Sequence, residues 1–183
     1  MRPDATLLAW WLDELDEEEA NDVEAHLFEC EECGARLREL LELGAGVKRA
    51  LLEGHVAGAV SGKFINRLRE DGLNIREYRV ASGDSVACTV APDDDVVVSY
   101  LQAPLAGVRQ LDAVFDDHTG THRATHIPFN AAANEVTFIA PTALLKTWGV
   151  AQQRVRLLAV TQGVERVVGE YTFRHSPWPQ HGA

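Results

Sequence analysis

A chain of 183 residues with a hydrophobic fraction of 46% can bury a core and form one domain or two small ones, which excludes wholesale disorder. No apolar run approaches the roughly 18 residues of a membrane-spanning helix, so we expect a cytoplasmic protein without a membrane partner. The net charge of −11 is concentrated in residues 1–75, where 17 acids and 8 bases give −9. Such a field repels phosphate, so we expect no direct nucleic-acid binding but attraction of a basic partner.

Residues 1–55 are predicted to form a small bundle of short helices. Apolar residues at helical spacing predict the first helix, namely Leu8, Trp11, Leu12 and Leu15. Asp16 followed by Glu19 is a capping-box pattern, which predicts the start of the second helix. A third helix is predicted to begin near Cys33 and to run towards Leu51.

His26, Cys30 and Cys33 place three soft metal ligands within eight residues, in the spacing H-x3-C-x2-C. His26 and Cys30 are one turn apart on one helix face, and Cys33 stands where the next helix begins. A helix N-terminus favours the thiolate that binds metal. One zinc ion would thus clamp two helices together. The alternative is a core histidine near two ordinary buried cysteines.

Residues 56–74 are predicted to form a hinge and a fourth helix. The stretch "LEGHVAGAVSG" at residues 52–62 is rich in glycine and alanine, which favours a break or hinge. Ser61 can cap a short helix that Asp71 and Gly72 end. Its apolar side chains are Phe64, Ile65 and Leu68, and its basic ones are Lys63, Arg67 and Arg69.

From residue 75 to residue 183 the apolar period changes from 3.6 to 2, as in the alternation of Val86, Cys88 and Val90. About seven short segments rich in β-branched and aromatic residues are separated by turn signals. The predicted fold class is therefore α+β in two segregated domains. A helical bundle of about four short helices precedes an antiparallel β-sandwich.

His118, His122 and His126 raise the alternative of a second metal site and a metalloenzyme. Because Thr119 and Gly120 break a helix, a hairpin turn followed by a strand is expected here. Polar residues on an exposed hairpin are the favoured interpretation. The sequence carries no nucleophile-elbow, phosphate-loop or zinc-protease motif, so we expect no enzyme.

The stretch "LLAWWLDELDEEEANDVEAHLFECEECGARLREL" resembles the zinc-binding anti-sigma domain over about residues 4–55. The resemblance implies an inhibitor of an extracytoplasmic-function sigma factor that blocks its binding to RNA polymerase. It also implies that the helices wedge between the two main domains of the sigma factor. A separate C-terminal sensory domain would regulate release. The expected partner-binding residues are Leu8, Trp11, Leu12, Phe64, Ile65 and Leu68.

The sequence departs from this family at the fourth metal ligand. The family takes that ligand from just ahead of the first helix, where this sequence offers neither His nor Cys. Asp4 is the nearby substitute, and His55 or Cys88 would have to fold back. We therefore expect a weak or non-stoichiometric zinc site. A metal or redox sensor with another partner is a further alternative.

Overall fold

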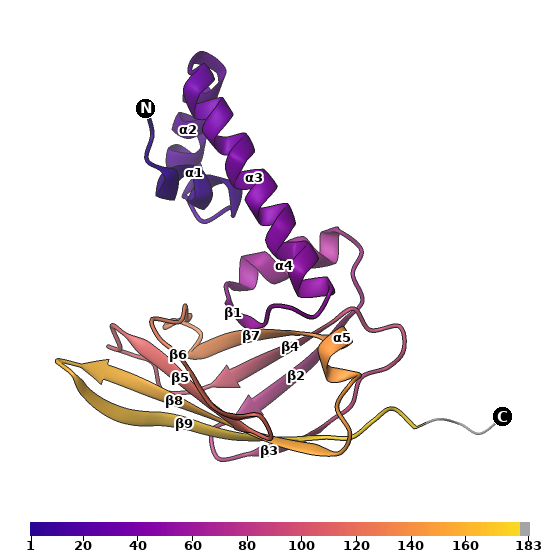
Figure 1. Cartoon of the computed structure of the whole chain (residues 1–183). Coiled ribbons are helices and arrows are strands. Elements are labelled where there is room, and N and C mark those ends of the chain that lie inside the picture. The colour runs from indigo at the N-terminus through magenta and orange to yellow at the C-terminus, as the bar shows by residue number, and fades with distance from the viewer. Residues whose placement is uncertain (180–183) are drawn as a thin grey trace. The chain divides into compact units, whose positions relative to one another are not determined.

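The computed structural model describes residues 1–179 and divides into two compact units, Met1–Ala50 and Leu51–Ala183. Helices make up the first unit, and strands dominate the second (Figure 1). The predicted order of a helical segment followed by a β-rich one is therefore correct. The last four residues of the predicted domain 75–183 lie outside the described residues.

Three helices build the first unit: α1 (Asp4–Trp11), α2 (Glu17–Glu29) and α3 (Glu31–Leu52), whose last two residues belong to the second unit. The capping prediction is confirmed in part, because the Asp16 carboxylate accepts a 2.9 Å hydrogen bond from the backbone N–H of Glu19. A buried core is supplied by all three helices through Leu7, Val23 and Cys33.

α1 lies against α3 where α3 has a glycine. A Cβ atom at Gly44 would stand only 2.9 and 3.1 Å from two ring atoms of Trp11. Since real Cβ contacts are almost never this short, glycine is what permits the close approach. Trp11 is predicted to contact a partner, but part of its ring is covered by α3 of the same unit.

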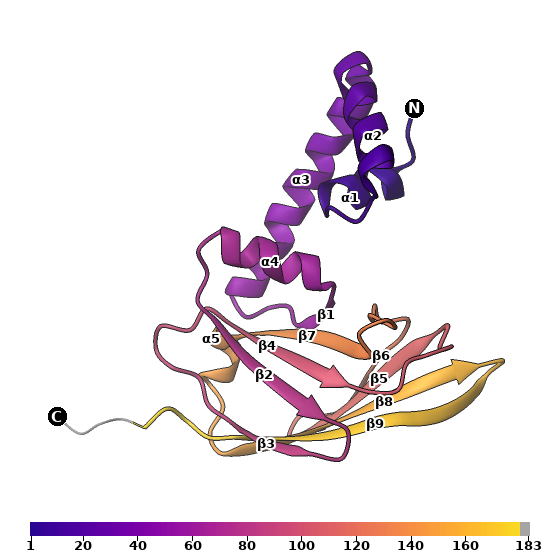
Figure 2. The same cartoon turned by 180° about the vertical axis from the view of Figure 1, so that it is seen from behind.

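The second unit contains two sheets and two short helices, as Figure 2 shows from behind. One sheet has the order β1-β7-β4-β2, with strands Gly58–Val60, Glu135–Pro141, Val96–Gln102 and Ile75–Ala81. The other has the order β3-β9-β8-β5-β6, with strands Ser85–Cys88, Val164–His175, Ala151–Thr161, Leu111–Asp117 and Gly120–Ala124. The helices are α4 (Gly62–Glu70) and α5 (Thr142–Leu145).

Both sheets are mixed, which corrects the predicted antiparallel arrangement. β2 pairs with β4 in parallel, and β3 pairs with β9 in parallel. The chain leaves the first sheet after β2, forms β3 in the second sheet and returns as β4, so β4 runs in the direction of β2. Period-2 alternation reports which face is buried and carries no information on strand direction. The predicted bundle of about four helices also differs, because the first unit contains α1, α2 and α3, while α4 belongs to the second unit.

The middle of the predicted hinge forms a β-strand. Gly58, Ala59 and Val60 form β1 and pair antiparallel with residues 137–139 of β7. The Ser61 cap is confirmed, since its hydroxyl accepts a 3.4 Å hydrogen bond from the backbone N–H of Phe64. The division predicted at residues 55 and 74 stays a prediction, whereas the compact units divide at residue 50.

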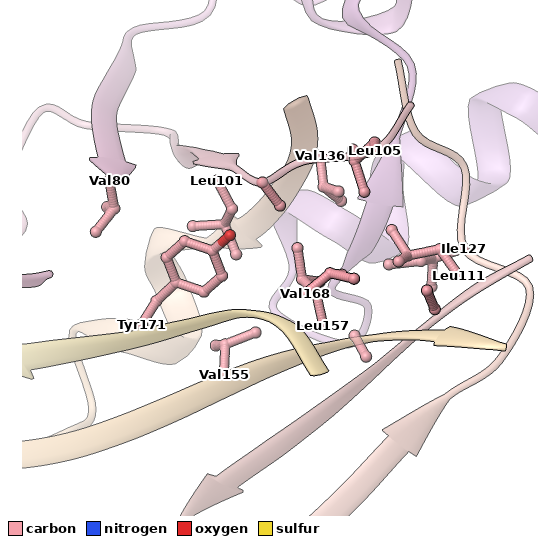
Figure 3. Close-up of a cluster of buried hydrophobic side chains, with 13 residues drawn as sticks. Val80, Leu101, Leu105, Leu111, Ile127, Val136, Val155, Leu157, Val168 and Tyr171 are labelled. Atoms are coloured by element: carbon pink, nitrogen blue, oxygen red, sulfur yellow. The ribbon is translucent and has the colours of Figure 1, made fainter. Parts of the chain in front are cut away.

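One hydrophobic cluster joins the two sheets, with side chains of both interleaved (Figure 3). Leu101 and Val136 come from the first sheet, while Leu157 and Tyr171 come from the second. A second cluster lies on the other face of the first sheet. It is formed by the last turn of α3, by α4 and by outward residues of the sheet, namely Leu51, Ile65, Leu68, Val96, Val98, Tyr100 and Ile139.

Asp112 is a buried carboxylate, only 1% exposed, and it is well partnered. It accepts hydrogen bonds from Arg123 Nη2 at 2.6 Å, the His126 backbone N–H at 3.0 Å and Gln110 Nε2 at 3.2 Å. Burial by itself raises the pKa of Asp112. These hydrogen bonds, with a further one from Arg123 Nε at 3.2 Å, outweigh burial and hold the pKa below its ordinary value of 3.8.

We expect Asp112→Asn to lower the free energy of unfolding by about 2–3 kcal/mol at neutral pH, measured by urea titration. Because the folded pKa is depressed, the stabilisation is complete above the unfolded pKa and is lost as pH falls through the folded pKa. The difference between the two proteins should therefore begin to shrink as pH falls below about 4 and keep shrinking as pH falls through the folded pKa. Exposed Asp93→Asn is the control, with a change within about 0.5 kcal/mol. A difference in stability that is as large at about pH 2 as at neutral pH would contradict this assignment.

Candidate metal centre

His26, Cys30 and Cys33 meet at the junction of α2 and α3, and their ligand atoms all lie within 4.8 Å of one another. His26 stands in the last turn of α2, and Cys30 follows that helix with its backbone N–H bonded to the His26 carbonyl at 2.9 Å. Cys33 lies in the first turn of α3 and is fully buried. The predicted ligands are thus brought together by the local helix–helix turn.

The α3 N-terminus acts on Cys30. The pKa of the Cys30 thiol is lowered, first by a hydrogen bond from the Cys33 backbone, then by one from the Cys33 side chain and one from the Glu32 backbone. Sequence reasoning assigned this effect of the helix N-terminus to Cys33. Cys30 receives it because Cys30 directly precedes the first turn of α3, where backbone N–H groups lack helical partners.

The arrangement fits zinc. His26 Nε2 is buried and has no hydrogen-bond partner, a costly state that coordination to a metal would relieve. Ligand bonds of about 2.0–2.3 Å in a tetrahedral site place ligand atoms about 3.3–3.8 Å apart, so a small contraction suffices. All three cysteines are free rather than joined in a disulfide. These residues can therefore hold a zinc ion, which would stabilise the α2–α3 junction.

The segment ahead of α1 reaches the centre without supplying a fourth ligand. The Arg2 backbone N–H lies 3.3 Å from Cys33 Sγ, at the place where the resemblance puts that ligand. Asp4, the suggested substitute, is held by Arg36 instead, with Nε–Oδ1 and Nη2–Oδ2 distances of 2.9 and 2.6 Å. Within residues 1–179, no fourth His, Cys, Asp or Glu joins the group.

The other two suggested ligands belong to the second unit and have other neighbours. His55 Nε2 lies 3.7 Å from a carboxylate oxygen of Glu53. Cys88 Sγ lies 3.9 Å from His175 Nδ1. Neither residue is part of the metal-ligand group.

A cysteine at position 2 is expected to complete the site. We predict that Arg2→Cys tightens zinc binding about a hundredfold or more, because four-ligand zinc sites release about 10 kcal/mol or more in total. Zinc affinity would be measured by competition with a chromophoric chelator on reduced protein. Ala45→Cys, an exposed position on α3, controls for the added thiol, and Arg2→Ala controls for loss of the Arg2–Asp22 ion pair. Equal affinity of the Arg2→Cys and Ala45→Cys proteins would contradict the prediction.

The predicted partner-binding residues differ in exposure. Leu8 on α1 is 38% exposed, whereas Trp11, Leu12 and Phe64 are half-buried. Ile65 and Leu68 are 0% and 2% exposed, because α4 lies with these side chains against the first sheet. In this structure they are therefore core residues of the second unit.

Sequence reasoning missed several exposed apolar side chains on the helices. Phe28 is 85% exposed, and Leu43 and Val47 on α3 are 66% and 47% exposed. Phe28 lies outside the helix face that carries His26 and Cys30, and this position in the sequence indicates that its side chain is exposed. Exposed large side chains of this kind add to the surface that a partner can contact.

His118, His122 and His126 do not form a metal site among the described residues. His118 packs edge-on to Trp148 with ring centroids 4.9 Å apart, and His122 Nε2 lies 2.8 Å from the Thr119 hydroxyl. His126 follows β6 with a φ of 54°. The predicted turn and strand are confirmed as the β5–β6 hairpin. The histidine-based metalloenzyme therefore lacks support.

Comparison with known families agrees with the geometry of the first unit. Residues 5–34 match the family model described as "Putative zinc-finger", and this segment ends one residue after Cys33. The match confirms the resemblance to the zinc-binding anti-sigma domain. It indicates a regulatory protein rather than an enzyme. No curated protein matches the chain.

A search of solved structures found the N-terminal domain of phage TP901-1 ORF48. It shows 11% sequence identity and a TM-score of 0.38, with 57% of this chain and 98% of that one covered. Among the helices of residues 1–179, none combines the length and the apolar character that crossing a membrane requires.

Proposed function

We propose that the protein is a cytoplasmic anti-sigma factor that sequesters an extracytoplasmic-function sigma factor and keeps it from RNA polymerase. The observation that carries the proposal is the zinc-finger match of residues 5–34, together with the three gathered ligands His26, Cys30 and Cys33. This family is typical of anti-sigma factors. The acidic character of residues 1–75 supports a partner with a basic surface.

The proposed binding surface combines apolar anchors with acidic surroundings. Leu8 and Phe28 are exposed, and the first turn of α2 carries Glu17, Glu18 and Glu19. Apolar side chains at an interface centre supply most of the affinity, while rim charges speed and orient encounter. Zinc at the α2–α3 junction would hold these helices in the orientation that the partner recognises.

α4 is the proposed regulatory element. In the family it binds the sigma factor, and here Ile65 and Leu68 are buried against the first sheet of the second unit. The same apolar face cannot be in both places at once. The sheet therefore competes with the sigma factor for α4, and whatever strengthens docking of α4 on the sheet favours release of the sigma factor.

The test is coexpression of the full chain with the sigma factor encoded beside it, followed by copurification and a reconstituted transcription assay. The expected result is a stable complex and loss of transcription from the sigma-dependent promoter. Leu8→Asp should weaken the complex by about thirtyfold, since an apolar anchor contributes about 2 kcal/mol. The exposed Ala25→Asp on α2 adds the same charge and serves as the control. Full transcription in the presence of excess wild-type protein would refute the proposal.

A further inference from the structure

A cavity of about 390 Å³ lies between the two sheets of the second unit. Leu101 and Val155 belong both to its wall and to the cluster that Figure 3 shows, so the cavity continues the hydrophobic core. Protein cores are normally packed without such voids. The volume falls in the range of about 300–1,000 Å³ that is usual for small-molecule sites.

The wall of the cavity is mainly apolar and rich in aromatic rings. Side chains from both sheets and from the segment after α5 supply these rings, which are Tyr78, Phe115, Phe138, Trp148 and Phe173. Phe115 and Phe138 meet edge to face across the two sheets with centroids 5.2 Å apart. Rings in such a wall present both faces and edges to a planar aromatic guest.

The Nε2 atom of His175 is a buried polar atom in the cavity wall. This wall residue is 4% exposed, and its Nε2 has no hydrogen-bond partner. Burial lowers its pKa, and although the Leu145 backbone acts in the opposite direction, the ring stays neutral. Leaving such a nitrogen unpaired costs about 1–3 kcal/mol, which a hydrogen-bonding ligand would recover. Sequence reasoning assigned His175 no role.

The charges on the wall select against anions. Asp117 is part of the wall, and among the described residues that line the cavity there is no Lys or Arg. Burial alone raises the pKa of Asp117, but hydrogen bonds from the Thr119 side chain and backbone and from Gln153 lower it overall, so the carboxylate is charged. An anionic ligand would be desolvated beside this carboxylate, and the described lining residues include no Lys or Arg to pair with it.

We propose that the cavity binds an uncharged or weakly basic aromatic molecule whose hydrogen-bonding group pairs with His175. The regulatory role of this binding rests on the proposed function. Along β4, Val97, Ser99 and Leu101 face the cavity, whereas Val96 and Val98 carry α4 on the opposite face. Because the ligand and α4 share one strand, a bound ligand stiffens the surface on which α4 docks.

The experiment uses two probes of matched shape. N-phenyl-1-naphthylamine is an uncharged aromatic amine, and 8-anilino-1-naphthalenesulfonate has the same rings and an added sulfonate. Fluorescence titration of the full chain should show one molecule of the amine bound per chain, and the sulfonate should bind about tenfold more weakly or worse. Equal binding of both probes, or no binding of the amine, would overturn the proposal.

Variants locate the bound amine. Ala124→Phe fills the cavity from β6 and should weaken binding about tenfold or more, while exposed Ala87→Phe on β3 should leave it unchanged. His175→Phe keeps a ring but removes the nitrogen and should also weaken binding, by about tenfold. If a variant fails to fold, the site is located instead by the changes in amide chemical shifts of the wild-type chain when the amine is added. The largest changes should fall on β4, β7 and β9. Changes confined to residues 1–50 would refute binding in this cavity. Because no sigma factor is present, this outcome is independent of the anti-sigma proposal.

Discussion

A chain carrying Phe64→Asp and Leu68→Asp is expected to release the sigma factor. Each apolar anchor at an interface centre contributes about 2 kcal/mol or more, so the pair should weaken the complex about a thousandfold. Two carboxylates on the apolar face of α4 would have to be desolvated at that interface. The measurement is the dissociation constant of the purified complex, by surface plasmon resonance.

The burial of Leu68 calls for a control on folding. Leu68 is 2% exposed in the second unit, so its replacement by Asp also loosens α4 from the sheet. Gly62→Asp with Asn66→Asp adds two carboxylates to the same helix at exposed positions, and a side chain at Gly62 meets no atom within 4 Å. This control should bind the sigma factor normally. Undiminished binding by the Phe64→Asp and Leu68→Asp protein would refute the role of α4.

Gly169→Ala is expected to lower the free energy of unfolding by about 3 kcal/mol. The ring of Tyr171 lies over Gly169, and a Cβ atom there would stand 2.8 and 2.9 Å from Tyr171 Cζ and Cε2. The ring cannot move freely, because it is 2% exposed and its hydroxyl donates a 2.7 Å hydrogen bond to the Gln102 carbonyl. Burial also raises the pKa of Tyr171 to about 12, which keeps the phenol neutral as that donor.

A double-mutant cycle tests the cause by urea unfolding. Tyr171→Val removes the ring, so adding Gly169→Ala to it should cost about 2 kcal/mol less than in the wild-type chain. Gly58→Ala, on β1 with no atom within 4 Å of the added carbon, should change stability by about 0.5 kcal/mol at most. Strictly additive effects of the two changes at positions 169 and 171 would contradict the steric explanation.

Local patterns made the first unit and the metal ligands predictable. Spacings of three and four residues place His26, Cys30 and Cys33 around one helix junction, whatever the rest of the chain does. The caps at Asp16 and Ser61 are local as well, since each side chain bonds an N–H three residues ahead. The resemblance to the zinc-binding anti-sigma domain, in contrast, indicated that the fourth ligand expected ahead of the first helix was missing.

Contacts between distant segments escaped prediction. The parallel pairing of β2 with β4 depends on β3 joining the other sheet, and the cavity depends on how two sheets meet. The unpaired nitrogen of His175 is visible only once its neighbours are placed. The close approach of Gly169 to Tyr171 likewise depends on which face of β9 covers the core.

The sequence by itself determined that a helical segment precedes a β-rich one, where the caps at Asp16 and Ser61 lie, and which three residues form the metal-ligand group. Only the tertiary structure decided what each apolar face covers. Ile65 and Leu68 show the reason: their spacing requires burial, and the hydrophobic effect has no direction, so a partner and the chain's own sheet satisfy it equally. The folded chain places them on the sheet, which makes α4 the proposed point of control.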